Sequence, residues 1–207
     1  YIFSYVGGGF AERFSSVLRP AKTFALSSFE IDPADINIVS RLLASGRGAH
    51  ILLYGRAGCG KTEFAKSAAV SVGRKIFVPT RNENEKKSLN LVGIKSAVFA
   101  STNSKGIVLV DEADDFLETA DSIFDTKRNL EKGGLNMFLD SVKTPVLWIS
   151  NSIDGIDGST RRRFAYTLEF DGISDTQRRN VLESLLLENG IYYDVGKELF
   201  EVAKQCR

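Results

Sequence analysis

Residues 55–62 have the composition and spacing of a phosphate-binding loop. They are Gly55, Arg56, Ala57, Gly58, Cys59, Gly60, Lys61 and Thr62, which match the P-loop pattern G-x-x-x-x-G-K-[ST]. The glycines let the backbone curl so that several N–H groups converge on one anion, at the N-terminus of the following helix. In such a loop the lysine neutralises the β- and γ-phosphates of a nucleotide, and the Thr62 hydroxyl coordinates Mg²⁺. The alternative is a glycine turn without function, and the apolar run before the loop favours phosphate binding.

Two carboxylates follow a second apolar run. Residues 107–110 are four consecutive apolar residues, mostly β-branched, which indicates a parallel strand buried on both faces. Ligands bind at the carboxyl ends of such strands, where Asp111 and Glu112 stand. We predict that Asp111 holds Mg²⁺ and that Glu112 orients or deprotonates an attacking water. The alternative is a solvated acidic loop, because two more aspartates follow closely, but pairing with the P-loop favours function.

Further candidate residues follow the next apolar run, residues 146–150. Asn151 ends this run and should lie beside the P-loop. There it could hold the γ-phosphate or the attacking water; the alternative is a turn residue without function. Three arginines, Arg161, Arg162 and Arg163, come shortly after it. A guanidinium fork matches phosphoryl oxygens, so these arginines either contact a phosphate or form a solvated patch.

The local patterns predict the elements that position these residues. Asp32 is an N-cap before Pro33, and apolar residues recur at helical spacing until Gly46. Strands are expected at 51–54, 75–79, 107–110, 146–150 and 165–170, with a helix over residues 62–72. Residues 121–134 are expected to form a loop or broken helix before an amphipathic helix that starts at Leu135 and stops before Pro145.

The two ends of the chain are assigned separately from the core. We expect residues 1–28 to be a partly ordered lead-in or linker, residues 29–171 an α/β core, and residues 172–207 a partial helical lid. A capping box at residues 174–177 begins the lid. The chain begins at Tyr1 without Met, which we take to indicate a piece of a longer polypeptide.

Composition excludes several classes of protein. The 207 residues are 43% hydrophobic and carry a net charge of +1, from 27 basic and 26 acidic residues. They can therefore bury a full core, and no basic field points to nucleic acid. Only two cysteines are present, which argues against a fold held by disulfides. No apolar run approaches the roughly 20 residues that a helix needs to cross a bilayer. We expect a cytoplasmic protein without a membrane segment.

The order of these motifs resembles the ATPase domain of the AAA family, over roughly residues 31–207. The resemblance rests on the P-loop, the Asp-Glu strand, the strand ending in Asn, and residues 157–164, an Asp-x-x-x-x-Arg-Arg-Phe-like segment. It implies a five-stranded parallel sheet flanked by helices, a helical lid, ATP and Mg²⁺ as ligands, and self-association into a ring, usually a hexamer. By this likeness Asn151 is sensor 1, and Arg163, with Arg162, is the arginine finger that reaches a neighbour's site. Residues 28–31 would lie near the adenine.

The chain departs from the family pattern in three places. Family members that remodel proteins carry an aromatic-hydrophobic-Gly pore loop, and the best match is residues 91–93, Leu-Val-Gly, which lack the aromatic. The segment 93–106 is short, and the lid is short and has no clear sensor-2 arginine.

Three functions are compatible with these patterns to different degrees. The leading hypothesis is an ATPase motor that remodels a protein substrate. The second is a nucleotide-regulated DNA-associated or signalling switch whose ATP state controls assembly. A phosphotransferase is disfavoured because Glu112 suits water activation, and a GTPase is disfavoured because the chain has no Asn-Lys-x-Asp segment.

Overall fold

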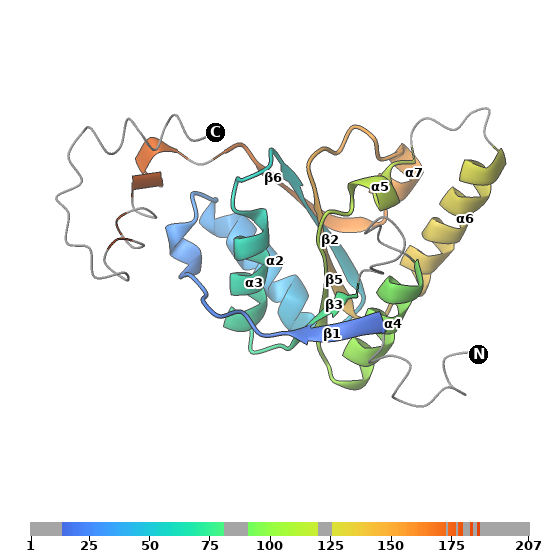
Figure 1. Cartoon of the computed structure of the whole chain (residues 1–207), viewed down its shortest axis with the longest axis horizontal. Helices are drawn as coiled ribbons and strands as arrows, with labels where there is room; N and C mark the ends of the chain where they lie inside the picture. The colour runs from blue at the N-terminus through green and yellow to red at the C-terminus, as the bar shows by residue number, and fades with distance from the viewer. Residues whose placement is uncertain are drawn as a thin grey trace.

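The computed structural model describes residues 14–80, 91–119 and 126–172, with isolated positions 174–176, 178–179, 183 and 186 beyond them; for residues 126–132 it describes only the backbone. A six-stranded sheet lies between two layers of helices (Figure 1). The strand order is β1-β3-β4-β5-β2-β6. Of the lid predicted for residues 172–207, most lies outside the described residues.

Five neighbouring strands run parallel, as the sequence predicts. They are β2 (Ala49–Gly55), β3 (Ile76–Pro79), β4 (Ile107–Val110), β5 (Pro145–Ser150) and β6 (Phe164–Phe170). The sixth, β1 (Ser15–Leu18), pairs antiparallel with β3 at one edge. The lead-in expected over residues 1–28 thus contributes an edge strand. Its short sequence carries no period of its own, and its strand conformation depends on pairing with β3.

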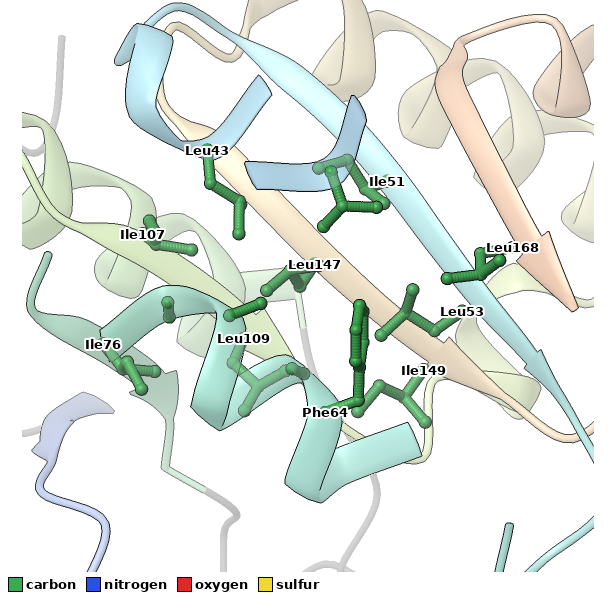
Figure 2. Packing of buried hydrophobic residues seen from close by; sticks show 14 of the residues in the cluster. Leu43, Ile51, Leu53, Phe64, Ile76, Ile107, Leu109, Leu147, Ile149 and Leu168 are labelled. Carbon is green, nitrogen blue, oxygen red and sulfur yellow. The ribbon is translucent and has the colours of Figure 1, made fainter. Parts of the chain in front are cut away.

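Alternating residues of the central strands pack into two separate cores. Ile51 and Leu53 of β2 face the helices α2 (Pro33–Ser45) and α3 (Lys61–Ser71), where Phe64 fills the middle of the cluster (Figure 2). Leu52, between them, faces the opposite core, which helices α4 (Leu91–Asn103) and α6 (Thr126–Ser141) cover. This alternation buries both faces of the sheet, as a parallel sheet requires.

Helix α2 begins and ends where the sequence predicts. The Asp32 carboxylate accepts a hydrogen bond from the Ala34 N–H at 2.8 Å, and Pro33 occupies the first helical position. Gly46 ends the helix with φ of 67°, in the left-handed region that glycine adopts without a steric penalty. The remaining helices are short: α5 (Asp114–Leu117), α7 (Gly158–Arg161) and the 3₁₀ turn η1 (Leu26–Ser28).

Two other helices correct the sequence interpretation. Helix α6 starts at Thr126 and continues through Gly133 and Gly134, so of the loop or broken helix expected up to residue 134, the part from Thr126 is unbroken helix. Burial of Leu135, Phe138 and Leu139 at its C-terminal half anchors the helix despite its two glycines. Residues 91–93 form the first turn of α4 rather than a loop, and the Leu91 side chain packs against the core. The best match to the family's pore loop, residues 91–93, thus begins a helix.

The topology brings three polar strand ends together. Strand β2 lies between β5 and β6, and β4 lies on the other side of β5. The carboxyl ends of β2, β4 and β5 consequently meet at one edge of the sheet, where ligands bind in open α/β folds. In the described part of the chain, no helix combines the length and apolar character needed to cross a membrane.

Candidate active site

Glycines shape the loop between β2 and α3. A side chain at Gly55 would place its Cβ 2.2 Å from the Phe170 carbonyl oxygen of β6, so the close approach of these strands requires glycine. Gly58 and Gly60 have φ of 79° and 84°, in the left-handed region. The loop therefore curls back over the N-terminus of α3, and its backbone N–H groups can serve an anion there.

Lys61 places a positive charge inside this loop. Its ammonium donates hydrogen bonds to the carbonyl oxygens of Gly55 at 2.5 Å and Arg56 at 2.7 Å. Burial lowers the pKa of Lys61, while the nearby Cys59, Asp114 and Asp111 oppose this effect. A buried ammonium beside converging N–H groups has the chemistry of a phosphate site.

Two oxygen ligands stand side by side next to the lysine. The Thr62 hydroxyl donates to Asp111 Oδ2 at 2.9 Å, and the backbone N–H of Glu112 donates to Asp111 Oδ1 at 2.9 Å. Mg²⁺ is usually held by one or two protein oxygens together with phosphate and water. Among the described residues no cluster of three His, Cys, Asp or Glu side chains has the arrangement of a metal site. The Thr62–Asp111 pair therefore fits Mg²⁺ shared with a phosphate better than a closed metal cage.

Glu112 has an unusual backbone conformation. It is exposed and has φ of 52°, one of two positive φ values among the described non-glycine residues. A left-handed conformation costs a residue with a Cβ roughly 1–2 kcal/mol. It turns the chain sharply at the end of β4, and Glu112 lines the cavity.

The end of β5 supplies Asn151 and a contact that sequence reasoning missed. Asn151 follows the strand directly, and its backbone N–H and Nδ2 donate to Asp114 at 2.6 and 3.2 Å. The Ser150 hydroxyl shares its one hydrogen between the same carboxylate at 2.9 Å and the Ser152 carbonyl at 2.7 Å. This contact between Asp114 and the end of β5 was not predicted from the sequence. The one signal in the sequence is that Asp114 comes three residues after Asp111. At that position Asp114 begins the short helix α5, and its side chain faces back to the end of β5.

These residues surround one cavity of about 420 Å³. This volume lies in the range typical of ligand pockets. The structure brings together the predicted residues of the loop, of β4 and of β5, and adds Asp114. The cavity lining consists of Ala57, Gly58, Cys59, Gly60, Lys61, Thr62, Glu63, Asp111, Glu112, Asp114, Ile149, Ser150 and Asn151. Gly55 and Arg56 lie below it and hold the lysine through their carbonyls.

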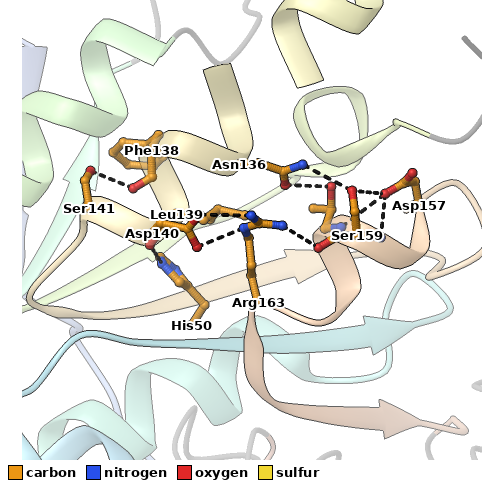
Figure 3. Close-up of polar contacts among 10 residues, drawn as sticks. His50, Asn136, Phe138, Leu139, Asp140, Ser141, Asp157, Ser159 and Arg163 are labelled. Atoms are coloured by element: carbon orange, nitrogen blue, oxygen red, sulfur yellow. Dashed lines mark hydrogen bonds and ion pairs between the residues drawn. The ribbon is translucent and has the colours of Figure 1, made fainter. Parts of the chain in front are cut away.

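The arginines lie away from this cavity. Arg163 precedes β6 at its amino end, and its guanidinium pairs with both oxygens of Asp140 on α6 at 2.9 Å and with the Ser159 carbonyl at 2.7 Å (Figure 3). The hydrogen bonds raise the pKa of Arg163 and lower the pKa of Asp140. Arg161 donates to two backbone carbonyls, of Ile156 and Ile153. Arg162 is exposed, and within the described ranges its side chain has no hydrogen bond or ion pair.

A smaller cavity adjoins the P-loop on its other side. It has a volume of about 170 Å³, and its lining includes Phe29, Ile31 and Phe170, with Cys59 shared between the two cavities. Phe29 packs edge-to-face on Phe64 with ring centroids 5.3 Å apart. Residues 29–31, predicted to lie near a base, are thus placed beside the phosphate loop.

Comparison with known proteins identifies the family. The family model described as "ATPase family associated with various cellular activities (AAA)" matches residues 51–172, more than half of the chain. The chain belongs to the AAA family. The match begins in β2 and ends just after β6, so the AAA domain contains all three strand ends of the cavity.

Relatives and solved structures agree with this assignment. The Danio rerio outer mitochondrial transmembrane helix translocase is 30% identical over 175 residues, which cover 80% of this chain and 47% of the relative. The human ATPase family AAA domain-containing protein 3B is 29% identical over 199 residues, or 86% of this chain and 31% of the relative. The AAA chain thus spans half or less of the length of these relatives.

The fold of the AAA domain is also found in solved structures. The crystal structure of the FIGL-1 AAA domain in complex with ADP superposes with a TM-score of 0.57 at 18% identity, covering 90% of this chain and 66% of that chain. The identity is low, so this likeness supports the P-loop NTPase fold alone.

Proposed function

We propose that this AAA domain binds ATP with Mg²⁺ and hydrolyses it. The observation that carries the proposal is the placement of Lys61 and the Thr62–Asp111 pair inside one cavity that Glu112 also lines. In this proposal residues 55–62 are the Walker A loop, and Asp111 with Glu112 form the Walker B end of β4. The geometry of the cavity supports each assignment.

In this proposal each group of cavity residues has a separate role in ATP binding and hydrolysis. The loop N–H groups and Lys61 bind the β- and γ-phosphates, exchanging the lysine's carbonyl partners for phosphate oxygens. Thr62 and Asp111 hold Mg²⁺, which supplies positive charge against the phosphate oxygens when bound. Glu112 orients a water molecule in line with the γ-phosphate and takes its proton, while Asn151 contacts the γ-phosphate or the water. The small cavity beside Phe29 and Ile31 receives the base, as its position next to the P-loop supports.

Exchange of Glu112 tests the hydrolysis step. Glu112→Gln keeps the size of the side chain but removes the base, so we expect ATP to bind normally while turnover falls by about 10² or more. Phosphate release and calorimetric ATP affinity are measured in parallel. Glu118→Gln, an exposed glutamate of the same loop region, is the matched control and should keep wild-type turnover. Wild-type turnover in Glu112→Gln would rule out this role for Glu112.

We further propose that the full-length protein assembles into a ring, of six subunits by family likeness, and acts on a protein substrate. The AAA family and a relative named for translocating transmembrane helices support this proposal. The exposed Arg162 and the paired Arg163 would then face the nucleotide of a neighbouring subunit, since neither lines its own cavity. The absence of a membrane segment and of a nucleic-acid partner, and a cytoplasmic location, stay predictions from the sequence.

A second candidate function is a switch in which the ATP state controls assembly. The position of Leu91 favours it, because this partly buried side chain packs against the core in the first turn of α4 and lacks the aromatic ring of the family's pore loop. Substrate-stimulated turnover separates the two functions. A remodelling motor should hydrolyse ATP faster with its protein substrate, whereas a switch should change its assembly state with ATP or ADP at a low, constant turnover.

A further inference from the structure

A third acidic side chain connects the two strand ends that carry Asp111 and Asn151. Asp114 is the first residue of α5 and lines the cavity. Its Oδ1 accepts hydrogen bonds from the Ser150 hydroxyl at 2.9 Å and from the Asn151 backbone N–H at 2.6 Å, and its Oδ2 accepts one from Asn151 Nδ2 at 3.2 Å. All three bonds therefore join the turn after β4 to the end of β5.

These contacts determine how Asn151 presents its amide. An ionised carboxylate only accepts hydrogen bonds, so the nitrogen of the Asn151 side chain must face Asp114. The amide oxygen and the second N–H are then directed away from Asp114. Hydrogen bonds to a charged acceptor are roughly twice as strong as those between neutral groups, which restricts rotation of the amide.

The two strand ends also have a contact that does not depend on the Asp114 side chain. The Ala113 N–H donates to the Ile149 carbonyl at 2.8 Å, and Ala113 is fully buried. The loop after β4 should therefore remain beside β5 when the carboxylate is replaced. The Asp114 side chain can thus be tested separately from the fold.

We propose that Asp114 is a positioning residue that holds the Asn151 amide toward the γ-phosphate of bound ATP. The inference rests on the proposed function, since it assumes that the cavity binds ATP. Both carboxylate oxygens of Asp114 accept hydrogen bonds from the end of β5, and in this proposal Asp114 makes no contact with the nucleotide. It acts through Asn151, and loss of Asp114 should affect only ligands that carry a γ-phosphate.

The first experiment compares nucleotides with and without a γ-phosphate. Binding of AMP-PNP, a non-hydrolysable ATP analogue, and of ADP is measured by calorimetry with Mg²⁺ for the wild type and for Asp114→Asn. We expect AMP-PNP affinity to fall about tenfold, as for loss of a charge-assisted hydrogen bond, and ADP affinity to stay unchanged. Asp115→Asn, the exposed neighbour, is the matched control and should change neither affinity. Equal weakening of both nucleotides would overturn the proposal.

A double-mutant cycle tests whether Asp114 acts through Asn151. Asn151→Ala should also lower AMP-PNP affinity, and adding Asp114→Asn to it should cost nothing further. Additive losses would mean that Asp114 contacts the nucleotide or metal independently, and would overturn the proposal. Thermal unfolding is recorded for each variant. Asp114→Glu, which keeps the charge but displaces the carboxylate by one methylene, is the second variant and should shift AMP-PNP affinity in the same direction.

The same measurements distinguish failure of this inference from failure of the proposed function. A wild-type chain that binds neither AMP-PNP nor ADP would overturn the ATP site itself. A wild type that binds both nucleotides, with Asp114→Asn binding them equally well, would leave the ATP site intact and overturn only the role of Asp114.

Discussion

The affinity for nucleotide should depend most on the charge of Lys61. Replacing it with methionine keeps the length of the side chain and removes the ammonium that the loop carbonyls now hold. Hydrogen bonds to charged groups contribute about 1.5–3 kcal/mol, so ATP affinity should fall roughly 10- to 100-fold. Calorimetry with ATP and Mg²⁺ measures the change.

Lys66 supplies the control for this prediction. It lies on the same helix and forms an ion pair with Glu63 at 2.7 Å, without lining the cavity. Lys66→Met should keep ATP affinity within about twofold, because exposed ion pairs contribute little. Unchanged affinity in Lys61→Met would refute the P-loop assignment.

At the residue scale, the sequence predicted those residues of the candidate site that belong to a contiguous motif. Lys61 and Thr62 are placed by their own loop, and Asp111 by the strand that it ends. Asp114 escaped prediction because its role depends on Asn151, 37 residues further along the chain, and on the adjacency of β4 and β5. A one-dimensional pattern does not state which carboxylate faces which strand end.

Among the elements, β2 and β5 are joined to α6 through His50, the only histidine in the chain. The Trp148 indole N–H donates to His50 Nδ1 at 3.0 Å, so the ring is neutral and its Nε2–H donates to the Leu139 carbonyl at 2.9 Å. Burial lowers the pKa of His50, opposed by the Leu139 carbonyl and by Asp140. The neutral ring thus connects two strands with a helix.

The fold should accordingly lose stability as the pH falls below about 6.5, the ordinary histidine pKa. The folded-state pKa is lower than the unfolded one, so the stabilisation is complete above the unfolded pKa and is lost as the pH falls toward the folded value. Urea unfolding at pH 7.5 and 5.5 should show a loss of about 1 kcal/mol from this group. His50→Gln should be less stable at pH 7.5 but show a smaller difference between the two pH values. An equal difference in both proteins would contradict the prediction.

Helix α6 offers a test of its unexpected length. Gly134 is exposed within the helix, and a Cβ there would meet no atom within 4 Å. Alanine is favoured over glycine in a helix interior by about 0.5–1 kcal/mol, so Gly134→Ala should raise the free energy of unfolding by that amount. Gly55→Ala is the opposite case and should destabilise the fold, because its Cβ would clash with Phe170. A destabilised Gly134→Ala would argue against helix at this position.

At the element scale, prediction succeeded where local signals agree and failed where tertiary contacts override them. Helix α2 has an N-cap, a proline and a terminal glycine, and its bounds follow from these alone. In α6 the glycines suggested a loop, but three buried residues of its C-terminal half hold the helix against the sheet. Leu91 was read as part of a loop from a family pattern, although its own neighbours continue into α4.

For the whole molecule, the proposed ring makes catalysis depend on a second subunit. The cavity described here contains one cation, Lys61, whereas charge in the transition state spreads over three γ-phosphate oxygens. A guanidinium from a neighbour would supply the missing charge. Arg162 is exposed, and Arg163 is held by Asp140, so the two arginines should contribute differently.

Arg162→Ala should leave ATP binding intact and lower the turnover of assembled protein by up to about 10³-fold. Arg163→Ala should lower turnover too, but it also removes the contact between α6 and the start of β6, so its thermal stability should fall where that of Arg162→Ala does not. Arg41→Ala, an exposed arginine on α2, is the control and should change neither quantity. The measurements are phosphate release and thermal unfolding, on full-length protein at concentrations where it assembles.

Mixing two inactive variants tests directly whether the arginine acts between subunits. A mixed assembly of Arg162→Ala and Glu112→Gln contains some interfaces that combine an intact Glu112 in one subunit with an intact Arg162 in the next. If the arginine acts on its neighbour's nucleotide, phosphate release should reappear on mixing and should depend on the ratio of the two variants. If it acts within its own subunit, each chain lacks one essential group and the mixture should stay as inactive as its components. Because Arg162 lies outside its own cavity, we expect activity to return.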